Sequence, residues 1–483
     1  MDISNKKLFK QQCFINGEWV DSQDNKSIDV NNPATQEIIG KVPNCGKKET
    51  SIAIKAAENS WKEWRSKTAK ERSNILKKWF RLIEENHEDL ARIMTVEQGK
   101  PIAEARGEIT YGASFVEWFA EEGKRVYGDT IPDVLPDRRI VIIKQPVGVV
   151  AAITPWNFPS SMITRKCAPA LAVGCPVVIK PASQTPFSAL ALGVLAEESG
   201  FPKGTINIIT GSAKEIGLEL STSPIVRKLS FTGSTEVGKI LLEQCSSTVK
   251  KVSMELGGHA PFIVFEDADI EEAVEGAIIS KFRNSGQTCI CANRLFVHDK
   301  VYDQFLEKFV KEVAKIKVGN GLETSINSGP LIDHYSLEKV KDHVNDAVNT
   351  GAKIAIGGDV HNLGGNFYQP TVLANVTTKA KITYEETFGP VAPIYKFSSD
   401  DEVIKMANDT PYGLASYFFA RDIGRIWKVA EALEYGIVSV NTGLPTKAEI
   451  PFGGIKESGL GREGSKYGLE DYLEIKYISM AGI

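Results

Sequence analysis

Hydrophobic side chains recur at helical spacing through much of the first hundred residues. Between Thr50 and about Glu97, apolar positions fall three or four residues apart. These positions are Leu76, Trp79, Phe80, Ile83, Leu90 and Met94. Many lysines and arginines lie between them, which fits a solvated outer face better than a membrane-binding face. We therefore predict helices that pack against a domain core.

Beyond Pro146 the pattern changes to short β-branched runs that alternate with helical stretches. The predicted strands are residues 147–153, 176–180, 206–210 and 226–232. The helical stretches that follow them lie near residues 160–172, 186–199, 213–220 and 233–245. Units of about 25–30 residues, each with one strand and one helix, are typical of βαβ crossovers and a parallel sheet. We predict a doubly wound nucleotide-binding fold for this region.

A second α/β alternation begins at residue 261 and extends to about Tyr467. Its first elements are a strand at 261–265, a helix at 269–284, a strand at 294–298 and a helix at 300–315. Two further apolar runs, 138–145 and 474–480, lie outside both alternations. Paired with each other, they would form a projecting sheet with exposed edges, and such a sheet typically pairs with another subunit.

Composition and charge narrow the possible partners. The chain has 483 residues, 42% of them hydrophobic, and a net charge of −4, which fits about three globular domains. A near-neutral chain does not attract a phosphate backbone, so nucleic acid is not expected as a partner. The longest apolar stretch, 168–179, is well short of the roughly 20 residues that span a bilayer. The N-terminus carries no export signal, so we expect a cytoplasmic protein without a membrane partner.

The cysteines and histidines exclude two further classes. Seven scattered cysteines in so long a chain do not form a disulfide scaffold, and only Cys289 and Cys291 lie close together. The six histidines show no metal-ligand spacing, so no metal site is expected.

A phosphate-binding motif is indicated at GSTEVGK, residues 233–239. It lies at a strand-to-helix junction, where free backbone N–H groups and the helix dipole favour an anion. Ile240 replaces the hydroxyl residue that a P-loop needs to hold Mg²⁺, which disfavours a P-loop nucleotide hydrolase. Gly233 and Ser234 then either bind a dinucleotide pyrophosphate or form an ordinary Ser-capped helix. GLGREG, residues 459–464, does not follow a strand, so we interpret it as a loop.

A candidate nucleophile and base lie in MELGG (254–258) and GQTCICANR (286–294). Cys289 follows G-Q-T in a predicted loop, where a thiol is more accessible than in an apolar run, and a thiolate is a strong nucleophile. Glu255 lies among apolar residues and glycines, which can desolvate its carboxylate and raise its pKa. The alternatives for each residue alone are a buried thiol and a surface charge.

Seven motifs resemble those of the aldehyde dehydrogenase superfamily. They are ITPWNFP (153–159), IKPAS (179–183), FTGSTEVG (231–238), ELGG (255–258), GQTC (286–289), EETFGPV (385–391) and PFGGIKESGLGREGSKYG (451–468). They occur in the family's order over essentially the whole chain. Within the family, GQTCICANR, ITRK and the GLGREGSKYG tail look most like succinate-semialdehyde dehydrogenases.

The resemblance implies a catalytic role for three residues. Cys289 matches the nucleophile that attacks the aldehyde carbon to form a thiohemiacetal. Asn157 matches the amide that stabilises the resulting oxyanion together with the Cys289 backbone N–H. Glu255 matches the base that activates water to hydrolyse the thioester left after hydride transfer to a nicotinamide.

The resemblance also implies cofactor-binding residues. They are Trp156 and Lys180 near the adenosine ribose, Gly233 and Ser234 at the pyrophosphate, and Glu386 with Phe388 near the nicotinamide ribose. Relatives that prefer NAD carry a glutamate three residues after the lysine, where it would repel a 2′-phosphate. Ser183 occupies this position, so we expect NADP to be preferred, with NAD possible as a second cofactor.

Arg165 and Arg283 match the carboxylate-binding positions of succinate-semialdehyde dehydrogenases, with an interdomain ion pair as the alternative for each. A guanidinium binds a carboxylate through two parallel hydrogen bonds. The loop 443–451 departs from the subgroup pattern, with Thr446 where the subgroup has a serine, so the chain length of the substrate stays open. Cys291 is either half of a reversible disulfide with Cys289 or an inert packing thiol.

These expectations define one fold and one leading function. The fold class is α/β, with two doubly wound Rossmann-like domains and a small β-strand oligomerisation arm. The ranges are 1–125 and 146–254 for the cofactor-binding domain, 255–467 for the catalytic domain, and 126–145 and 468–483 for the arm. The expected reaction is oxidation of succinate semialdehyde, or a close small ω-carboxy aldehyde, to its acid by a homodimer or homotetramer.

Three alternative functions stand beside this one. The first is a glutarate-semialdehyde or broader aldehyde dehydrogenase. A CoA-acylating enzyme is disfavoured because Glu255 is present. A catalytically silent binding protein on the same fold is disfavoured because Cys289, Glu255 and Asn157 are all retained.

Overall fold

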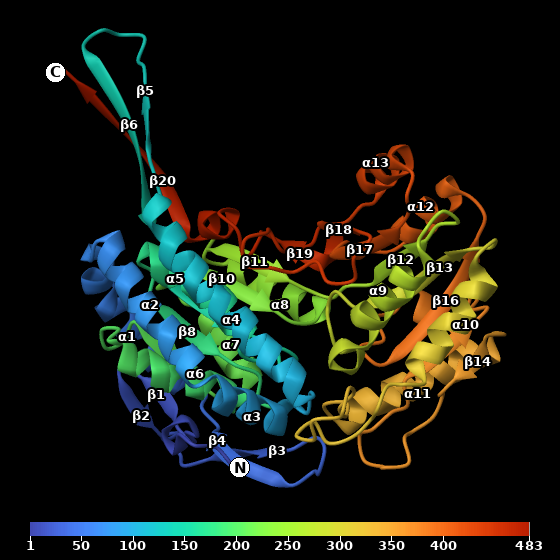
Figure 1. Ribbon diagram of the computed structural model, residues 1–483. Helices are drawn as coiled ribbons and strands as arrows, with labels where there is room; N and C mark the ends of the chain where they lie inside the picture. The colour runs from blue at the N-terminus through green and yellow to red at the C-terminus, as the bar shows by residue number, and fades with distance from the viewer. Residues whose placement is uncertain (483) are drawn as a thin grey trace.

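The computed structural model describes residues 1–482 and contains two α/β units and a projecting arm (Figure 1). The first unit is built on an eight-stranded sheet with the order β19-β11-β10-β7-β8-β9-β1-β2. Its strands are β1 (Cys13–Ile15), β2 (Glu18–Val20), β7 (Val149–Ile153), β8 (Val177–Lys180), β9 (Ile206–Ile208), β10 (Val226–Thr232), β11 (Lys251–Glu255) and β19 (Gly459–Leu460). The five central strands β11, β10, β7, β8 and β9 are parallel to one another. Starting from β7, the chain first adds β8 and β9 on one side, and it then adds β10 and β11 on the other side. The sheet is therefore doubly wound, as predicted.

Helices cover both faces of this sheet. One face packs against α1 (Lys47–Ser66), α7 (Ala213–Thr222) and α8 (Thr235–Ser246). The other packs against α2 (Ala69–Glu85), α3 (His87–Gln98), α4 (Ile102–Glu122), α5 (Ser161–Val173) and α6 (Pro186–Ser199). The helical stretch predicted from Thr50 to Glu97 is divided into three helices, because Thr68 and Glu71 form a capping box that starts α2 and Asn86 ends it.

The second unit has a seven-stranded sheet with the order β14-β15-β16-β13-β12-β17-β18. Its strands are β12 (Ala260–Val264), β13 (Ala292–His298), β14 (Lys353–Ile356), β15 (Thr371–Ala374), β16 (Val391–Phe397), β17 (Ala415–Phe419) and β18 (Ile437–Val440). All pairs are parallel except β14 with β15. The helices are α9 (Ile270–Phe282) and α10 (Tyr302–Val313) on one face, and α11 (His334–Asn349), α12 (Asp400–Asn408) and α13 (Ile423–Ala432) on the other.

The arm is a three-stranded antiparallel sheet that projects from the first unit (Figure 1). Its strands are β5 (Asp129–Ile131), β6 (Arg138–Pro146) and β20 (Leu473–Ala481). The predicted pairing of 138–145 with 474–480 is confirmed, and β5, which is too short to show a pattern, adds the third strand. Ile483, the last residue of the predicted arm, lies outside the described residues. A separate two-stranded sheet joins β3 (Ser27–Asn31) and β4 (Ile38–Pro43).

The two units meet where β11 ends and β12 begins. Residues 256–259 connect these strands, so the chain passes directly from one sheet to the other. The strand β19 falls within the range predicted for the second domain, yet it pairs with β11 of the first sheet. Gly459 permits this pairing, because its φ is +134° and an added Cβ would lie 1.8 Å from the Met254 carbonyl oxygen. None of the helices in residues 1–482 is long and apolar enough to cross a membrane.

Candidate active site

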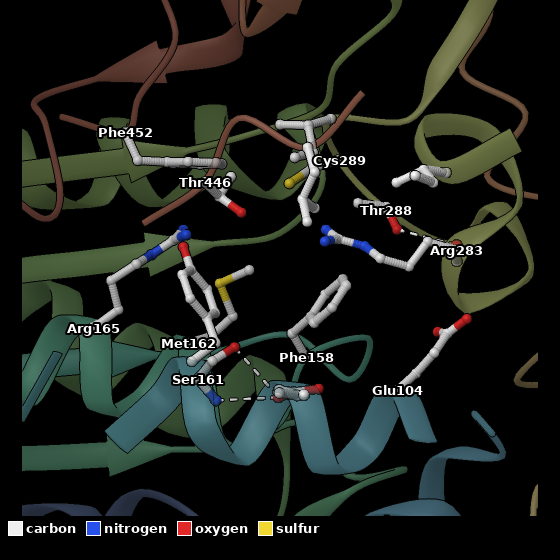
Figure 2. A pocket seen from close by; sticks show the side chains of 16 residues that line it. Glu104, Phe158, Ser161, Met162, Arg165, Arg283, Thr288, Cys289, Thr446 and Phe452 are labelled. Atoms are coloured by element: carbon white, nitrogen blue, oxygen red, sulfur yellow. Dashed lines mark hydrogen bonds between the residues drawn. The ribbon is translucent and has the colours of Figure 1, made fainter. Parts of the chain in front are cut away.

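Two cavities meet at Cys289. One, the switch-point cavity, has a volume of about 310 Å³ and opens beyond the carboxyl ends of β7 and β10. The other, the arginine cavity, has a volume of about 340 Å³ and is lined by Arg165, Arg283 and Thr446 (Figure 2). Ligands of doubly wound sheets bind at the point where the strand order reverses, which here lies between β7 and β10. Cys289 therefore lies between a dinucleotide-type crevice and a second cavity.

The Cys289 loop is held in a tightly turned conformation. Cys289 is the least buried of the seven cysteines. The short 3-10 helix η3 (Arg283–Gly286) precedes it and includes Asn284 and Ser285 at φ of 51° and 55°. Burial raises the pKa of the Cys289 thiol to about 12, although the nearby Arg165 acts in the opposite direction. The resting group is therefore a thiol rather than a thiolate.

Asn157 contacts the same loop. It follows β7, and its side-chain Nδ2 donates a hydrogen bond to the Gln287 carbonyl oxygen at 3.0 Å. An amide NH₂ group carries two hydrogens, so this bond fixes the orientation of the side chain and leaves the second hydrogen available. Asn157 is 3% exposed, which keeps that hydrogen away from bulk water. A side-chain amide fixed in this way and shielded from water can serve as a preorganised donor.

Glu255, the last residue of β11, is a buried carboxylate with no hydrogen-bond partner among the described residues. Burial raises its pKa well above the ordinary value, and the charge of Glu463 adds to this effect. An added Cβ on Gly453 would lie 2.9 Å from Glu255 Oε1, so that glycine leaves room for the carboxylate. A desolvated carboxyl group with free oxygens can accept a proton from water.

The arginine cavity presents two guanidinium groups toward its centre. Figure 2 shows Arg165 and Arg283 pointing toward each other from opposite sides, with Thr446 and Cys289 above them. The Nη2 atom of Arg165 is buried and has no partner among the described residues. Phe158 and Phe452 form apolar walls, and each ring lies against an arginine. The pocket thus fits a short apolar chain that ends in an anionic group.

The switch-point cavity is lined by five of the seven predicted cofactor residues. They are Trp156, Gly233, Ser234, Glu386 and Phe388. The Ser234 side chain caps α8 by accepting from the Val237 N–H at 3.3 Å, so the capped helix predicted as an alternative is present. Glu386 accepts from the Gly258 N–H at 3.1 Å, and burial raises its pKa to about 7.

Lys180 and Ser183 lie beside this cavity rather than in its wall. Lys180 ends β8 and is paired in register with Ile153 of β7, just before the segment that holds Trp156. Burial alone lowers the pKa of Lys180 to about 8. No carboxylate in residues 1–482 forms an ion pair with it, which leaves a buried cation available to an anion. Ser183 is half-buried in the loop that follows.

Comparison with known proteins gives the family. The sequence profile of the aldehyde dehydrogenase family matches residues 19–478. The chain belongs to the aldehyde dehydrogenase family. The resemblance found in the seven motifs is therefore confirmed, and so is the predicted α/β fold class.

Individual members of the aldehyde dehydrogenase family match over the whole chain. A glutarate-semialdehyde dehydrogenase from Pseudomonas aeruginosa is 61% identical over 483 residues, which is 100% of both chains. An NADP(+) succinate-semialdehyde dehydrogenase from Escherichia coli is 59% identical over 478 residues, 99% of each chain. The crystal structure of an NADP-dependent enzyme from E. coli superposes with a TM-score of 0.99 at 59% identity, and the match covers 99% of this chain and 100% of that chain.

Glu463 is a site residue that the sequence analysis missed. It lies in the GLGREG segment and forms buried ion pairs with Arg165 and with Lys166, the latter at 2.5 Å. Burial opposes its ionisation, but Lys166 and Arg165 outweigh this effect and lower its pKa to about 2. The ion pair weighed as an alternative for Arg165 therefore exists, and Arg165 lines the arginine cavity as well.

Helix α11 carries two further residues that support the site and that the sequence did not reveal. Lys339 donates to the Glu386 carbonyl oxygen at 2.6 Å. His343 contacts the side chains of Glu385 and Thr387, each at 3.1 Å, so α11 holds three consecutive residues of the EETFGPV segment. A helical Lys and His four residues apart do not by themselves indicate a distant loop, which is why the sequence pattern did not reveal them.

Cys291 points away from both cavities. Its Sγ donates to the Lys281 carbonyl oxygen at 3.2 Å, and the side chain is buried. Cys289 and Cys291 are both free thiols in the structure. A disulfide between them would break the bond to Lys281, and it stays a prediction.

We predict that Glu463→Gln lowers the free energy of unfolding by about 3–5 kcal/mol at neutral pH, because Arg165 and Lys166 would remain as uncompensated buried cations. The lowered pKa of Glu463 means that its contribution is present above the unfolded-state pKa, near 4.5, and is lost as pH falls toward 2. Urea unfolding at several pH values measures this difference, which should shrink in acid.

The matched control is Glu457→Gln, which removes an exposed ion pair with Lys239. Such pairs contribute under about 1 kcal/mol, so this variant should unfold almost like the parent protein. Equal stability losses in the two variants would contradict the importance of the buried ion cluster.

Proposed function

We propose that this enzyme oxidises a small ω-carboxy aldehyde to the acid, with succinate semialdehyde as the preferred substrate and NADP as the preferred cofactor. The observation that carries the proposal is the position of Cys289 at one end of a cavity that also presents Arg165 and Arg283. The guanidinium groups would bind the distant carboxylate, and the aldehyde carbon would then lie at the sulfur. An uncharged aldehyde would leave both guanidinium groups without that partner.

The residues of the site supply each step of the proposed reaction. Cys289 gives up its proton to solvent water as its sulfur adds to the aldehyde carbon, and Asn157 stabilises the oxyanion that forms. A nicotinamide dinucleotide held by the residues of the switch-point cavity would supply the hydride acceptor that this adduct needs to become a thioester. Glu255 then removes a proton from water, the hydroxide adds to the thioester carbon, and the acid leaves as the Cys289 thiol is restored. The unpartnered, buried carboxylate of Glu255 suits it to hold this water.

The residues beside the switch-point cavity fit a dinucleotide with a 2′-phosphate. Lys180 is a buried cation without a counter-ion among the described residues, and burial alone lowers its pKa. An additional phosphate would supply the missing negative charge. Ser183 adds no charge that would repel this phosphate. The name of the succinate-semialdehyde relative includes NADP(+), which agrees with this assignment.

Glutarate semialdehyde is the second candidate substrate. The relative at 61% identity is named a glutarate-semialdehyde dehydrogenase, and the one at 59% a succinate-semialdehyde dehydrogenase. The two aldehydes differ by one methylene group, which a hydrophobic pocket discriminates by only about 1–3 kcal/mol. Initial rates with both aldehydes, each with NADP and NAD, determine which is preferred.

The arm supports assembly into a homodimer or homotetramer. On its outer strand β20, Ile475 is 72% exposed and Tyr477 is 70% exposed. Apolar side chains on an open strand edge favour association with another chain. We propose that a second copy of this chain covers the arm.

We predict that Arg283→Ala raises KM for succinate semialdehyde by roughly 10–100-fold, because charged hydrogen bonds to a buried carboxylate contribute about 1.5–3 kcal/mol. KM for an uncharged aliphatic aldehyde of similar length should change less than about three-fold. Steady-state kinetics with the two aldehydes measure this contrast. An equal loss with both aldehydes would overturn the carboxylate assignment.

We predict that Ser183→Glu lowers the ratio of kcat/KM for NADP to that for NAD by at least about ten-fold, because the new carboxylate would repel the 2′-phosphate. Ser183→Gln, of similar size but uncharged, is the matched control and should keep most of the NADP preference. A ratio that Ser183→Glu leaves unchanged would refute the role of this position.

A further inference from the structure

Lys100 is a buried cation directly behind the proposed oxyanion donor. It lies between α3 and α4, and its side chain is 1% exposed. Its Nζ donates to Glu108 Oε2 at 2.6 Å and to the Asn157 carbonyl oxygen at 2.8 Å. The same ammonium lies 4.0 Å from the centre of the Phe158 ring, which lines the arginine cavity. Lys100 therefore contacts two consecutive residues of the site without lining either cavity.

The Asn157 carbonyl oxygen accepts a second hydrogen bond, from a residue of the Cys289 loop. Asn284 Nδ2 donates to it at 3.0 Å. Asn284 is itself held by Gln98, whose Nε2 donates to Asn284 Oδ1 at 3.1 Å. Gln98 Oε1 in turn accepts from the Lys100 backbone N–H at 2.9 Å. The two donors thus belong to one closed network that fixes the peptide group of Asn157.

Glu108 extends this anchor along the chain. Its Oε1 accepts from the backbone N–H groups of Ser160 and Ser161 at 3.0 and 3.1 Å. The Lys100–Glu108 pair thereby holds both ends of the segment 157–161. Burying an ion pair costs several kcal/mol unless further hydrogen bonds satisfy it. In this pair those further bonds all go to the segment that carries Asn157.

We propose that Lys100 is a positioning residue for the reaction: its ammonium anchors the Asn157 carbonyl so that the Asn157 side-chain amide stays directed at the Cys289 loop. The side-chain amide and the carbonyl of one residue are linked through a single Cα, so fixing the carbonyl limits where the amide points. Small displacements of a catalytic group can cost about 10²-fold in rate. The inference rests on the proposed role of Asn157 as the oxyanion donor.

A double-mutant cycle with Asn157→Ala tests this inference. Lys100→Met is combined with Glu108→Gln, because the pair removes both buried charges and the glutamine keeps an acceptor for Ser160 and Ser161. We expect this pair to lower kcat for succinate semialdehyde by about 10–100-fold, with the dissociation constant for NADP changed less than about two-fold. Asn157→Ala alone should lower kcat by about 10²–10³-fold. The triple variant should lose less than about three-fold beyond Asn157→Ala, because a misdirected amide and an absent amide have the same effect.

Two controls separate positioning from general damage. Glu97→Gln alters another buried carboxylate at the end of α3, which binds the Phe187 and Ser188 N–H groups, and its effect should multiply with that of Asn157→Ala. Lys100→Arg, with Glu108 unchanged, keeps the charge and the hydrogen-bond donors. Its kcat should therefore lie between that of the parent protein and that of the Lys100→Met/Glu108→Gln variant.

Each outcome of the cycle has a distinct meaning. Full multiplication of the Lys100→Met/Glu108→Gln effect with that of Asn157→Ala would overturn the positioning role. A parallel weakening of NADP binding and thermal stability that accounts for the whole rate loss would also overturn it. A loss below about three-fold for Asn157→Ala alone would instead refute the oxyanion role in the proposed function.

Discussion

Gly258 lies so close to the Cys289 loop that no side chain fits between them. An added Cβ would lie 2.2 Å from the Cys289 carbonyl oxygen. The backbone N–H of the same glycine binds Glu386, and three residues earlier the chain holds Glu255. One short connection between the two sheets therefore brings together the proposed nucleophile from one unit, the proposed base from the other and a carboxyl group of the switch-point cavity. The rest of the site depends on this close approach.

Buried charge is the second constraint, and it lies in two local clusters, one of three side chains and one of two. Arg165, Lys166 and Glu463 carry a net positive charge, which a substrate carboxylate would neutralise. Lys100 and Glu108 form a neutral pair behind Asn157. The net charge of −4 reveals neither cluster. In the proposed function, affinity for the anionic substrate would come from local desolvated cations, whose Coulomb interactions are stronger than those on the surface.

The elements that could be predicted from the sequence are those with a recognisable local pattern of apolar and polar residues. The β-branched runs of β7, β8 and β10 alternate with helices, and the paired arm strands are long enough to recognise. Cys289 and Glu255 lie in short motifs whose residue types suggest a nucleophile and a base, and the resemblance to the family adds the role expected of Asn157. Glu463 could not be found this way, because its partner Arg165 is 298 positions away. The strand β19 has only two residues, so neither periodicity nor composition marks it.

In the reaction that we propose, the substrate is oxidised as an adduct of Cys289 and released by water that Glu255 activates. Intact-protein mass spectrometry of Glu255→Gln after incubation with succinate semialdehyde and NADP tests it most directly. We expect a subunit heavier by one acyl group, located on Cys289 by peptide mapping, with about one reduced cofactor formed per active site and little further turnover. Undiminished turnover, or oxidation of the aldehyde without any acyl group on Cys289, would contradict it.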